Sequence, residues 1–172
     1  MIDTTKQEVL QSLRRCEIFL GLSDDDLEKI AALPSVRMKT FEAGVCISKE
    51  GEPAWNLCIL VEGKIDLRMG IQLDLAGPSE EITVDTVTKG SIFHWSALVP
   101  PYLLSRSSFS VTKSKVLAIN GKELLGLMDT NPRIGYEIMQ SIAAVIASRL
   151  KFPNNYFWAQ SIKNRVIQPD PD

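Results

Sequence analysis

The spacing of apolar residues along the chain first predicts two amphipathic helices. Apolar residues recur at helical spacing in residues 5–15 and again in residues 23–33. Ser23 is a favourable N-cap for the second helix, and Pro34 ends it. The acidic run Asp24–Asp26 falls in the first turn, where the helix dipole favours negative charge. Three consecutive helical residues point in different directions, so this run is not expected to bind a metal.

From residue 36 to residue 119 the pattern changes to short, often alternating runs rich in β-branched residues. Ile65, Leu67 and Met69 alternate with charged residues, which indicates a sheet with one face in water. Turn signals such as "EAG", "EGEPA" and "AGPSE" separate the runs. Many short strands in succession predict an antiparallel sandwich or barrel.

After Asn120 the helical spacing returns and predicts helices over residues 121–151. Asn120 and Glu123 form a pattern typical of a capping box, and Asn131 precedes a proline at the first position of a long helix. One face of this helix is apolar, with Ile134, Ile138, Ile142, Val145, Ile146 and Leu150. The order helices, strands, helices predicts an α+β fold, with one domain at residues 1–151 and a tail at 152–172.

Charge and composition narrow the classes of partner. The formal net charge of the 172 residues is -2, which gives no basic footprint for nucleic acid or an anionic membrane. No apolar run reaches the roughly 18 residues of a membrane span, and the N-terminus lacks the plan of a signal peptide. A cytoplasmic location is therefore expected.

The residues that commonly bind metals are few. The sequence has one histidine and three cysteines, Cys16, Cys46 and Cys58, which is too small a set for a zinc or iron–sulfur site. An odd number of widely spaced cysteines does not indicate a disulfide framework. We expect all three cysteines to be small buried apolar residues.

The order of these elements and their glycines resembles the cyclic-nucleotide-binding domain of the catabolite-activator and protein-kinase-regulatory type, over about residues 16–150. The stretch "FEAGVCISKEGEPAWNLCILVEGKIDL" is similar to that family's β-roll, with Gly44, Gly51 and Gly63 at its turns. The stretch "KGSIFHWSALVPP" is similar to the approach to its phosphate-binding cassette. The resemblance implies an antiparallel, jelly-roll-like β-roll over residues 36–119, flanked by N-terminal helices and a long C-terminal helix.

In that family the cassette binds the ligand. Amides of a short helix and an arginine hold the cyclic phosphate, and a carboxylate accepts from the ribose 2′-hydroxyl. This sequence has His94-Trp95 where the family has Gly-Glu, so the carboxylate is missing. Counting back from "VTKSKVLAI" places Leu103 or Leu104 at the arginine position. Arg106 lies two residues beyond Leu104, so on a strand it points to the same face.

The candidate ligand-binding residues are Phe93, His94, Trp95, Ser96, Ala97, Leu104, Arg106, Ser107 and Ser108. The expected ligand is a weakly bound cyclic nucleotide or another small anionic or aromatic molecule, and no other cofactor, metal or catalytic residue is expected. Two interpretations of Trp95 stay open: it fills the nucleotide pocket, or it stacks on a flat ligand. His94 is either a partly exposed loop residue or a ligand contact, and Arg106 either a solvated charge or an anion partner.

The resemblance implies a regulatory module rather than an enzyme. Ligand binding would reorient helix 131–151, which would also pair in a homodimer and pass the change to an unidentified protein partner. The alternative is a dimerisation or protein-interaction module without a ligand, its pocket filled by Trp95. Only about 20 residues follow the long helix, without a basic recognition helix, so direct DNA binding is not expected.

Overall fold

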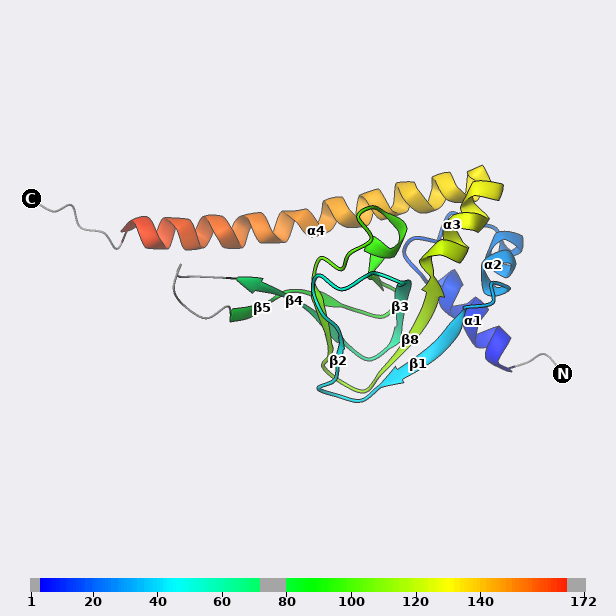
Figure 1. Cartoon of the computed structure of the whole chain (residues 1–172), viewed down its shortest axis with the longest axis horizontal. Helices are drawn as coiled ribbons and strands as arrows, with labels where there is room; N and C mark the ends of the chain where they lie inside the picture. Colours follow the sequence, from blue (N-terminus) through cyan, green and yellow to red (C-terminus); the bar gives the residue numbers. More distant parts are fainter. Residues whose placement is uncertain (1–3, 72–79, 167–172) are drawn as a thin grey trace, which may run out of the picture.

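The chain folds as helices, then two sheets, then helices (Figure 1). The computed structural model describes residues 4–71 and 80–166. The helices are α1 (Thr4–Arg14), α2 (Asp24–Ala31), the 3-10 helix η1 (Trp95–Leu98), α3 (Gly121–Thr130) and α4 (Pro132–Val166). The strands are β1 (Arg37–Phe41), β2 (Cys46–Ser48), β3 (Asn56–Glu62), β4 (Ile65–Ile71), β5 (Glu80–Val87), β6 (Ile92–Phe93), β7 (Ser107–Ser110) and β8 (Ser114–Asn120).

The strands form two four-stranded antiparallel sheets. One has the order β1-β8-β3-β6, and the other has the order β2-β7-β4-β5. The two sheets face each other as a β-roll, and no ladder joins them into a closed barrel among the described strands. This arrangement confirms the predicted α+β class and the jelly-roll-like β-roll.

Strands β3 and β8 separate two apolar cores because their side chains alternate between the faces of the sheet. Leu60, Val116 and Phe93 lie in the core inside the roll. Leu57 and Leu117 lie in the larger core beneath the helices. One sheet therefore serves both the roll and the helical layer, and β6 brings the segment at residue 93 into the roll.

The turn glycine at position 63 has a specific steric reason. Gly63 has a φ of 95°, in the left-handed region that favours glycine. A Cβ atom at this position would collide with the Ser114 side chain and the Lys113 carbonyl. The tight turn between β3 and β4 therefore requires glycine, as the sequence pattern predicts.

The helix caps agree with the sequence in most details. The Ser23 hydroxyl accepts from the Asp26 amide, and the Asp26 carboxylate accepts from the Ser23 amide, which makes a complete capping box. Asn120 caps α3 by accepting from the Lys122 and Glu123 amides. The box predicted for Glu123 does not close, because its carboxylate accepts from the Ser35 amide of the loop before β1.

Helix α4 is longer than the sequence pattern indicates. It was predicted to end at residue 151, but it continues to Val166, so residues 152–166 belong to the helix and not to a tail. Pro153 looked like the start of the tail, yet a proline inside a helix removes one hydrogen bond and can kink the helix without ending it. Figure 1 shows α4 running past the β-roll, and residues 167–172 of the expected tail lie outside the described residues.

One of the three cysteine predictions is wrong. Cys16 and Cys58 are buried, and burial raises the pKa of both thiols to about 12. Cys46 is exposed, because it lies on β2, an edge strand of its sheet. The expectation of three buried cysteines therefore holds for two.

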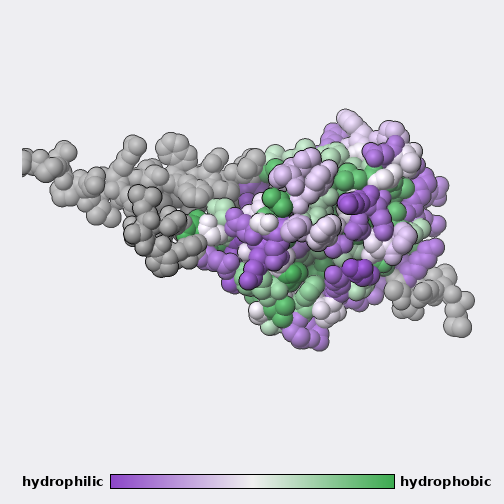
Figure 2. All heavy atoms as spheres, viewed as in Figure 1, coloured by the Kyte–Doolittle hydropathy of each residue, from purple (hydrophilic) through white to green (hydrophobic). Residues whose placement is uncertain are grey.

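The visible surface carries small apolar patches among polar residues (Figure 2). Within residues 4–71 and 80–166, no helix combines the length and the apolar character that crossing a membrane requires. Over the same residues, no three histidine, cysteine, aspartate or glutamate side chains gather in a group that could hold a metal ion.

Candidate ligand-binding cassette

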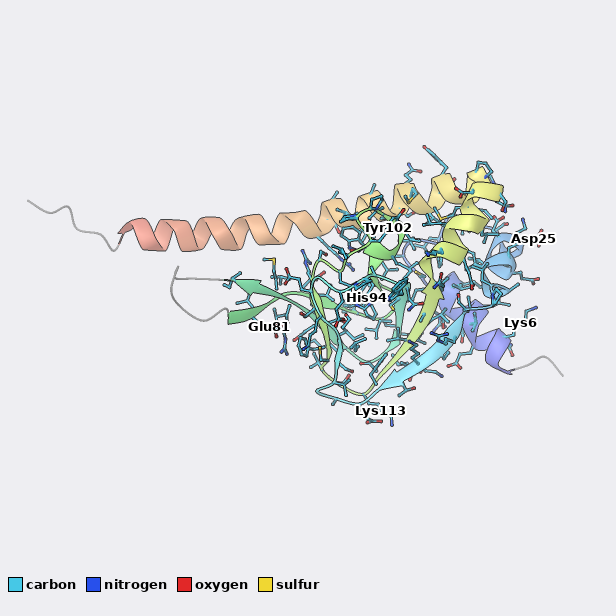
Figure 3. All side chains as sticks on the ribbon, in the orientation of Figure 1. Lys6, Asp25, Glu81, His94, Tyr102 and Lys113 are labelled. Carbon is cyan, nitrogen blue, oxygen red and sulfur yellow. The ribbon has the colours of Figure 1, made fainter. Side chains whose placement is uncertain are left out.

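His94 lies between β6 and η1 and points into the roll (Figure 3). Its backbone is left-handed, with a φ of 59°, a conformation that costs a non-glycine residue about 1–2 kcal/mol. Its Nε2 atom is 2.8 Å from the Ser48 hydroxyl and 3.1 Å from the Ser108 hydroxyl. The two hydroxyl oxygens are 2.7 Å apart. This network joins β2 and β7 to the cassette and offsets the backbone strain.

The His94 imidazole is neutral at physiological pH. Burial lowers its pKa to about 4, because the charged form loses its hydration inside the roll. A neutral imidazole supplies one donor and one acceptor. His94 is thus a part-buried loop residue that hydrogen-bonds two serines, and a direct contact with a ligand stays a prediction.

A small cavity lies beside His94, between η1, the start of β7 and α4. Five of the predicted site residues line it: His94, Trp95, Ser96, Leu104 and Arg106. Leu67, Ser105 and Arg149 complete the lining. Its volume is about 20 Å³, room for roughly one water molecule. The indole of Trp95 is half-buried and packs against the core beneath the helices.

The other four predicted residues lie close by but outside this cavity. Phe93 is fully buried in the core of the roll. Ala97 packs against Ala54 and Leu104. The Ser107 hydroxyl accepts from the Glu50 amide, and the Ser108 hydroxyl belongs to the His94 network. These residues hold the shape of the cassette.

Arg106 brings a positive charge to the cavity. It is half-buried, and among the described residues no carboxylate lies within ion-pair distance of its guanidinium. Burial lowers its pKa, Asp85 opposes this effect, and the positive charge of Arg149 adds to it. The guanidinium still remains charged, because arginine does not lose its proton in proteins. Arg106 is therefore a cation of the cassette that has no ion-pair partner among the described residues.

Arg149, on α4, is the charged one of the three cavity residues that the predicted set lacked. Its side chain is only 14% exposed, and its Nη2 atom donates to the Ile92 carbonyl over 2.7 Å. A signal was present: position 149 follows Ile142, Val145 and Ile146 at intervals of seven, four and three residues. That spacing places Arg149 on the apolar face of the helix, where a charge requires a partner.

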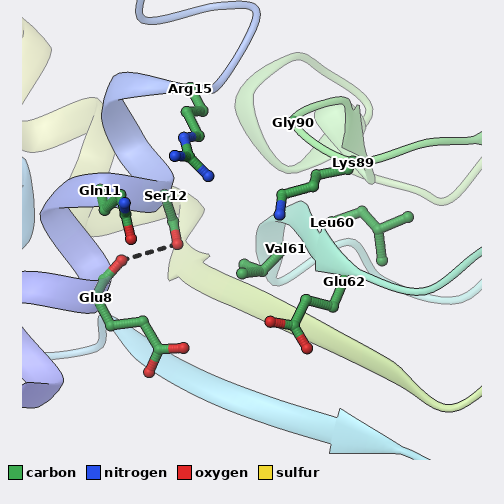
Figure 4. Close-up of a pocket in the computed structure, with 9 residues that line it drawn as sticks. All are labelled: Glu8, Gln11, Ser12, Arg15, Leu60, Val61, Glu62, Lys89 and Gly90. Atoms are coloured by element: carbon green, nitrogen blue, oxygen red, sulfur yellow. Dashed lines mark hydrogen bonds between the residues drawn. The ribbon is translucent and has the colours of Figure 1, made fainter.

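A second hollow lies between α1 and the end of β3 (Figure 4). Its volume is about 70 Å³, and both charges line it, with Arg15 and Lys89 against Glu8 and Glu62. The Glu8 carboxylate already pairs with Lys115 of β8. This hollow is separate from the cassette, and its mixed charge gives no preference for an anion.

The sequence model described as the cyclic nucleotide-binding domain matches residues 38–131. The chain belongs to this family. A crystal structure of a putative cyclic nucleotide-binding protein from Geobacter metallireducens GS-15 is 30% identical, with a TM-score of 0.67. That match covers 87% of this chain and 99% of the Geobacter chain. None of the curated proteins matches the chain.

Two further structures show the same fold. The catabolite activator protein of Thermus thermophilus is 22% identical, with a TM-score of 0.64, over 84% of this chain and 63% of its own. The regulatory domain of Toxoplasma gondii PKA, crystallised with cAMP, is 20% identical, with a TM-score of 0.61. That match covers 74% of this chain and 46% of the Toxoplasma chain. The resemblance inferred from the sequence is thereby confirmed.

The departures from the cyclic nucleotide-binding domain pattern can now be placed. His94 replaces the family's glycine, yet it keeps a left-handed φ that glycine adopts easily. Leu103 is 45% exposed, whereas Leu104 is buried in the cavity wall where the family's arginine was expected. Arg106 reaches the same cavity two residues later.

Proposed function

We propose that this cyclic nucleotide-binding domain is a regulatory module that binds a cyclic nucleotide weakly in the cassette beside His94. The observation that carries the proposal is Arg106, a half-buried cation in the cavity wall without a carboxylate partner among the described residues. A buried, unpaired charge is costly unless an opposite charge completes it. The phosphate of the ligand supplies that charge.

The affinity is expected to be low for two reasons. The carboxylate that would accept from the ribose hydroxyl is replaced by Trp95, and one lost charge-assisted hydrogen bond weakens binding about 10- to 100-fold. The cavity beside Arg106 is far smaller than the roughly 300–1,000 Å³ of ligand pockets, and the hollow of about 220 Å³ that His94 and Leu104 also line is below that range, so the cassette must widen before a nucleotide enters. Opening reduces the apparent affinity by the fraction of molecules that are open.

The ligand changes the position of α4 in this proposal. Trp95 and Arg149 both border the cavity, so a nucleotide that enlarges it alters the contacts of η1 and of the helix.

The chain acts as a sensor and not as an enzyme. The Cys58 thiol stays protonated because burial raises its pKa to about 12, and His94 interacts with two serines instead. A homodimer through α4 and an effector protein stay predictions.

Isothermal titration calorimetry with cyclic AMP and cyclic GMP tests the proposal. Wild-type protein should give saturable binding, and Arg106→Met should weaken it about 10- to 100-fold. Arg68→Met is the matched control, because Arg68 stacks over the Phe109 ring on β7 and does not line the cavity. Flat titrations of the wild type at millimolar nucleotide would refute the function.

A further inference from the structure

Arg149 belongs to α4, and its guanidinium lies against strands β5 and β6. The side chain is 14% exposed and lines the same cavity as Arg106. The two arginines come from positions 43 residues apart in the sequence. Two cations therefore border one cavity with room for about one water molecule.

Two nitrogens of the Arg149 guanidinium contact the roll and the link between α1 and α2. Its Nη2 atom donates to the Ile92 carbonyl over 2.7 Å and lies 3.7 Å from the Glu17 carboxylate. Its Nε atom lies 3.1 Å from Asp85 Oδ2. These contacts fix the plane of the guanidinium relative to β5 and β6, so the group is preorganised and does not swing freely.

The third nitrogen of the guanidinium is left without a partner. Arg149 Nη1 is buried and makes no hydrogen bond to the residues that the structure describes. Buried donors of charged groups are nearly always paired, because an unpaired one loses its hydration without compensation. Arg149 Nη1 is thus a fixed, charged donor that can still bind an acceptor atom of a ligand.

Arg106 adds a second reason to expect an anion. Burial lowers the pKa of Arg106, Asp85 opposes this effect, and the positive charge of Arg149 adds to it, so the two guanidinium groups repel each other beside a carboxylate that offsets the repulsion. An anion between them would relieve this repulsion and accept from both. Guanidinium groups match phosphate oxygens well because their donors form a rigid, planar fork.

We propose that Arg149 is the second anion-binding residue of the cassette, and that Arg106 and Arg149 together hold the phosphate group of the ligand. Two arginines thereby replace the missing cassette arginine: Arg106, directly before β7, and Arg149, on α4. The inference rests on the proposed function for the identity of the ligand. Its consequence is that the phosphate bridges the roll and α4, so binding energy acts directly on the position of the helix.

Affinity measurements with a charged and an uncharged probe test this role. Arg149→Met should weaken cyclic AMP binding about 10- to 100-fold and change adenosine binding less than about twofold, because only the phosphate contact is lost. Arg149→Lys should recover part of the affinity. Arg133→Met removes another arginine of α4, far from the cavity lining, and should leave both affinities unchanged.

Equal losses for cyclic AMP and adenosine, or an equal loss in Arg133→Met, would overturn the inference, since either result means that Arg149 merely holds α4 in place. Side-chain ¹⁵N NMR of the wild-type protein keeps the test decisive if a variant does not fold. Cyclic AMP and inorganic phosphate should each shift the Nε–H signals of both Arg106 and Arg149, and adenosine should shift neither.

The NMR outcomes also separate this inference from the proposed function. Shifts of Arg106 alone with cyclic AMP would contradict the role of Arg149 and leave the proposed function intact. Shifts of both arginines with phosphate but not with cyclic AMP would support the paired anion site and refute cyclic nucleotide binding. No shift with either probe would refute both.

Discussion

Helix α4 carries two arginines that each reach an aspartate on another element, and the two pairs differ. At the start of the helix, Arg133 pairs with Asp26 of α2. That carboxylate also accepts from the amide and the hydroxyl of Ser23. Sixteen residues farther along the helix, Arg149 pairs with Asp85, and this pair has fewer supporting hydrogen bonds. Asp85 Oδ2 and Arg149 Nη1 are both buried without a hydrogen bond among the described residues.

On the proposal above, the difference separates a structural contact from a ligand-binding one. Arg133 is 60% exposed, so water satisfies what Asp26 does not. Arg149 is 14% exposed, its Nη1 donor is buried without a partner among the described residues, and its side chain lines a cavity that a second arginine also lines. A completed pair stabilises the junction of α2 and α4, whereas an incomplete one is costly until a ligand completes it. Three changes test this contrast.

Asp26→Ala should give the largest loss of stability, because it removes the fully paired carboxylate that contacts the start of α4. The change deletes the capping box and the partner of Arg133, so unfolding in urea should show a loss of about 3 kcal/mol. Asp25→Ala is the control, since Asp25 is an exposed neighbour in the same turn and should cost about 0.5 kcal/mol. Equal losses would mean that charge near the helix start matters and the pairing does not.

The Asp26 pair also sets a pH limit. The Ser23 hydrogen bonds, and then Arg133, hold the pKa of this carboxyl well below its usual range. A carboxyl with a lowered pKa stabilises the fold above its unfolded value of 3.8, and the contribution disappears as the pH falls below that value. The effect therefore belongs to strongly acid conditions.

The second change concerns His94, whose hydrogen bonds to Ser48 and Ser108 are complete although it lines the same cavity as Arg149. Its pKa is lowered from 6.5 to about 4, so below pH 6.5 the unfolded chain binds a proton that the folded chain does not. Stability should fall by about 2 kcal/mol between pH 7 and pH 5, a window above that of Asp26. Urea unfolding of His94→Gln should lack this slope, and an unchanged slope would contradict the buried, neutral imidazole.

Trp95→Ala gives the smallest change in stability and sharpens the picture of the cavity. The indole is half-buried, so its loss should cost about 1.5 kcal/mol, less than a core tryptophan. Cyclic AMP affinity should rise about 10-fold, because the cassette no longer has to open. Trp55→Ala, at an indole 61% exposed, is the control and should alter neither quantity strongly. Weaker nucleotide binding in Trp95→Ala would identify the indole as a stacking surface.

Local sequence signals predict the scaffold well. Ser23, Asn120 and Pro132 mark helix starts that the structure confirms, because caps depend on neighbouring residues alone. The turn at Gly63 and the alternation of β4 are equally local. The roll, its strand order and the family follow from these elements taken together.

The site is harder to predict because its contacts join distant residues. His94 faces inward because its Nε2 atom hydrogen-bonds the hydroxyls of Ser48 and Ser108, which lie on two other strands. Arg149 reaches the cavity only once α4 has packed across the roll, although helical spacing places it on the apolar face. Exposure of Cys46 depends on β2 being an edge strand, which the sequence does not reveal.

A crystal structure of the protein with cyclic AMP tests the central claim most directly. The account predicts phosphate density between Arg106 and Arg149, with Trp95 displaced and the cavity enlarged. Density for the nucleotide with its phosphate away from Arg149 would contradict the two-arginine site. A cassette that stays closed and empty at saturating nucleotide would contradict the proposed function itself.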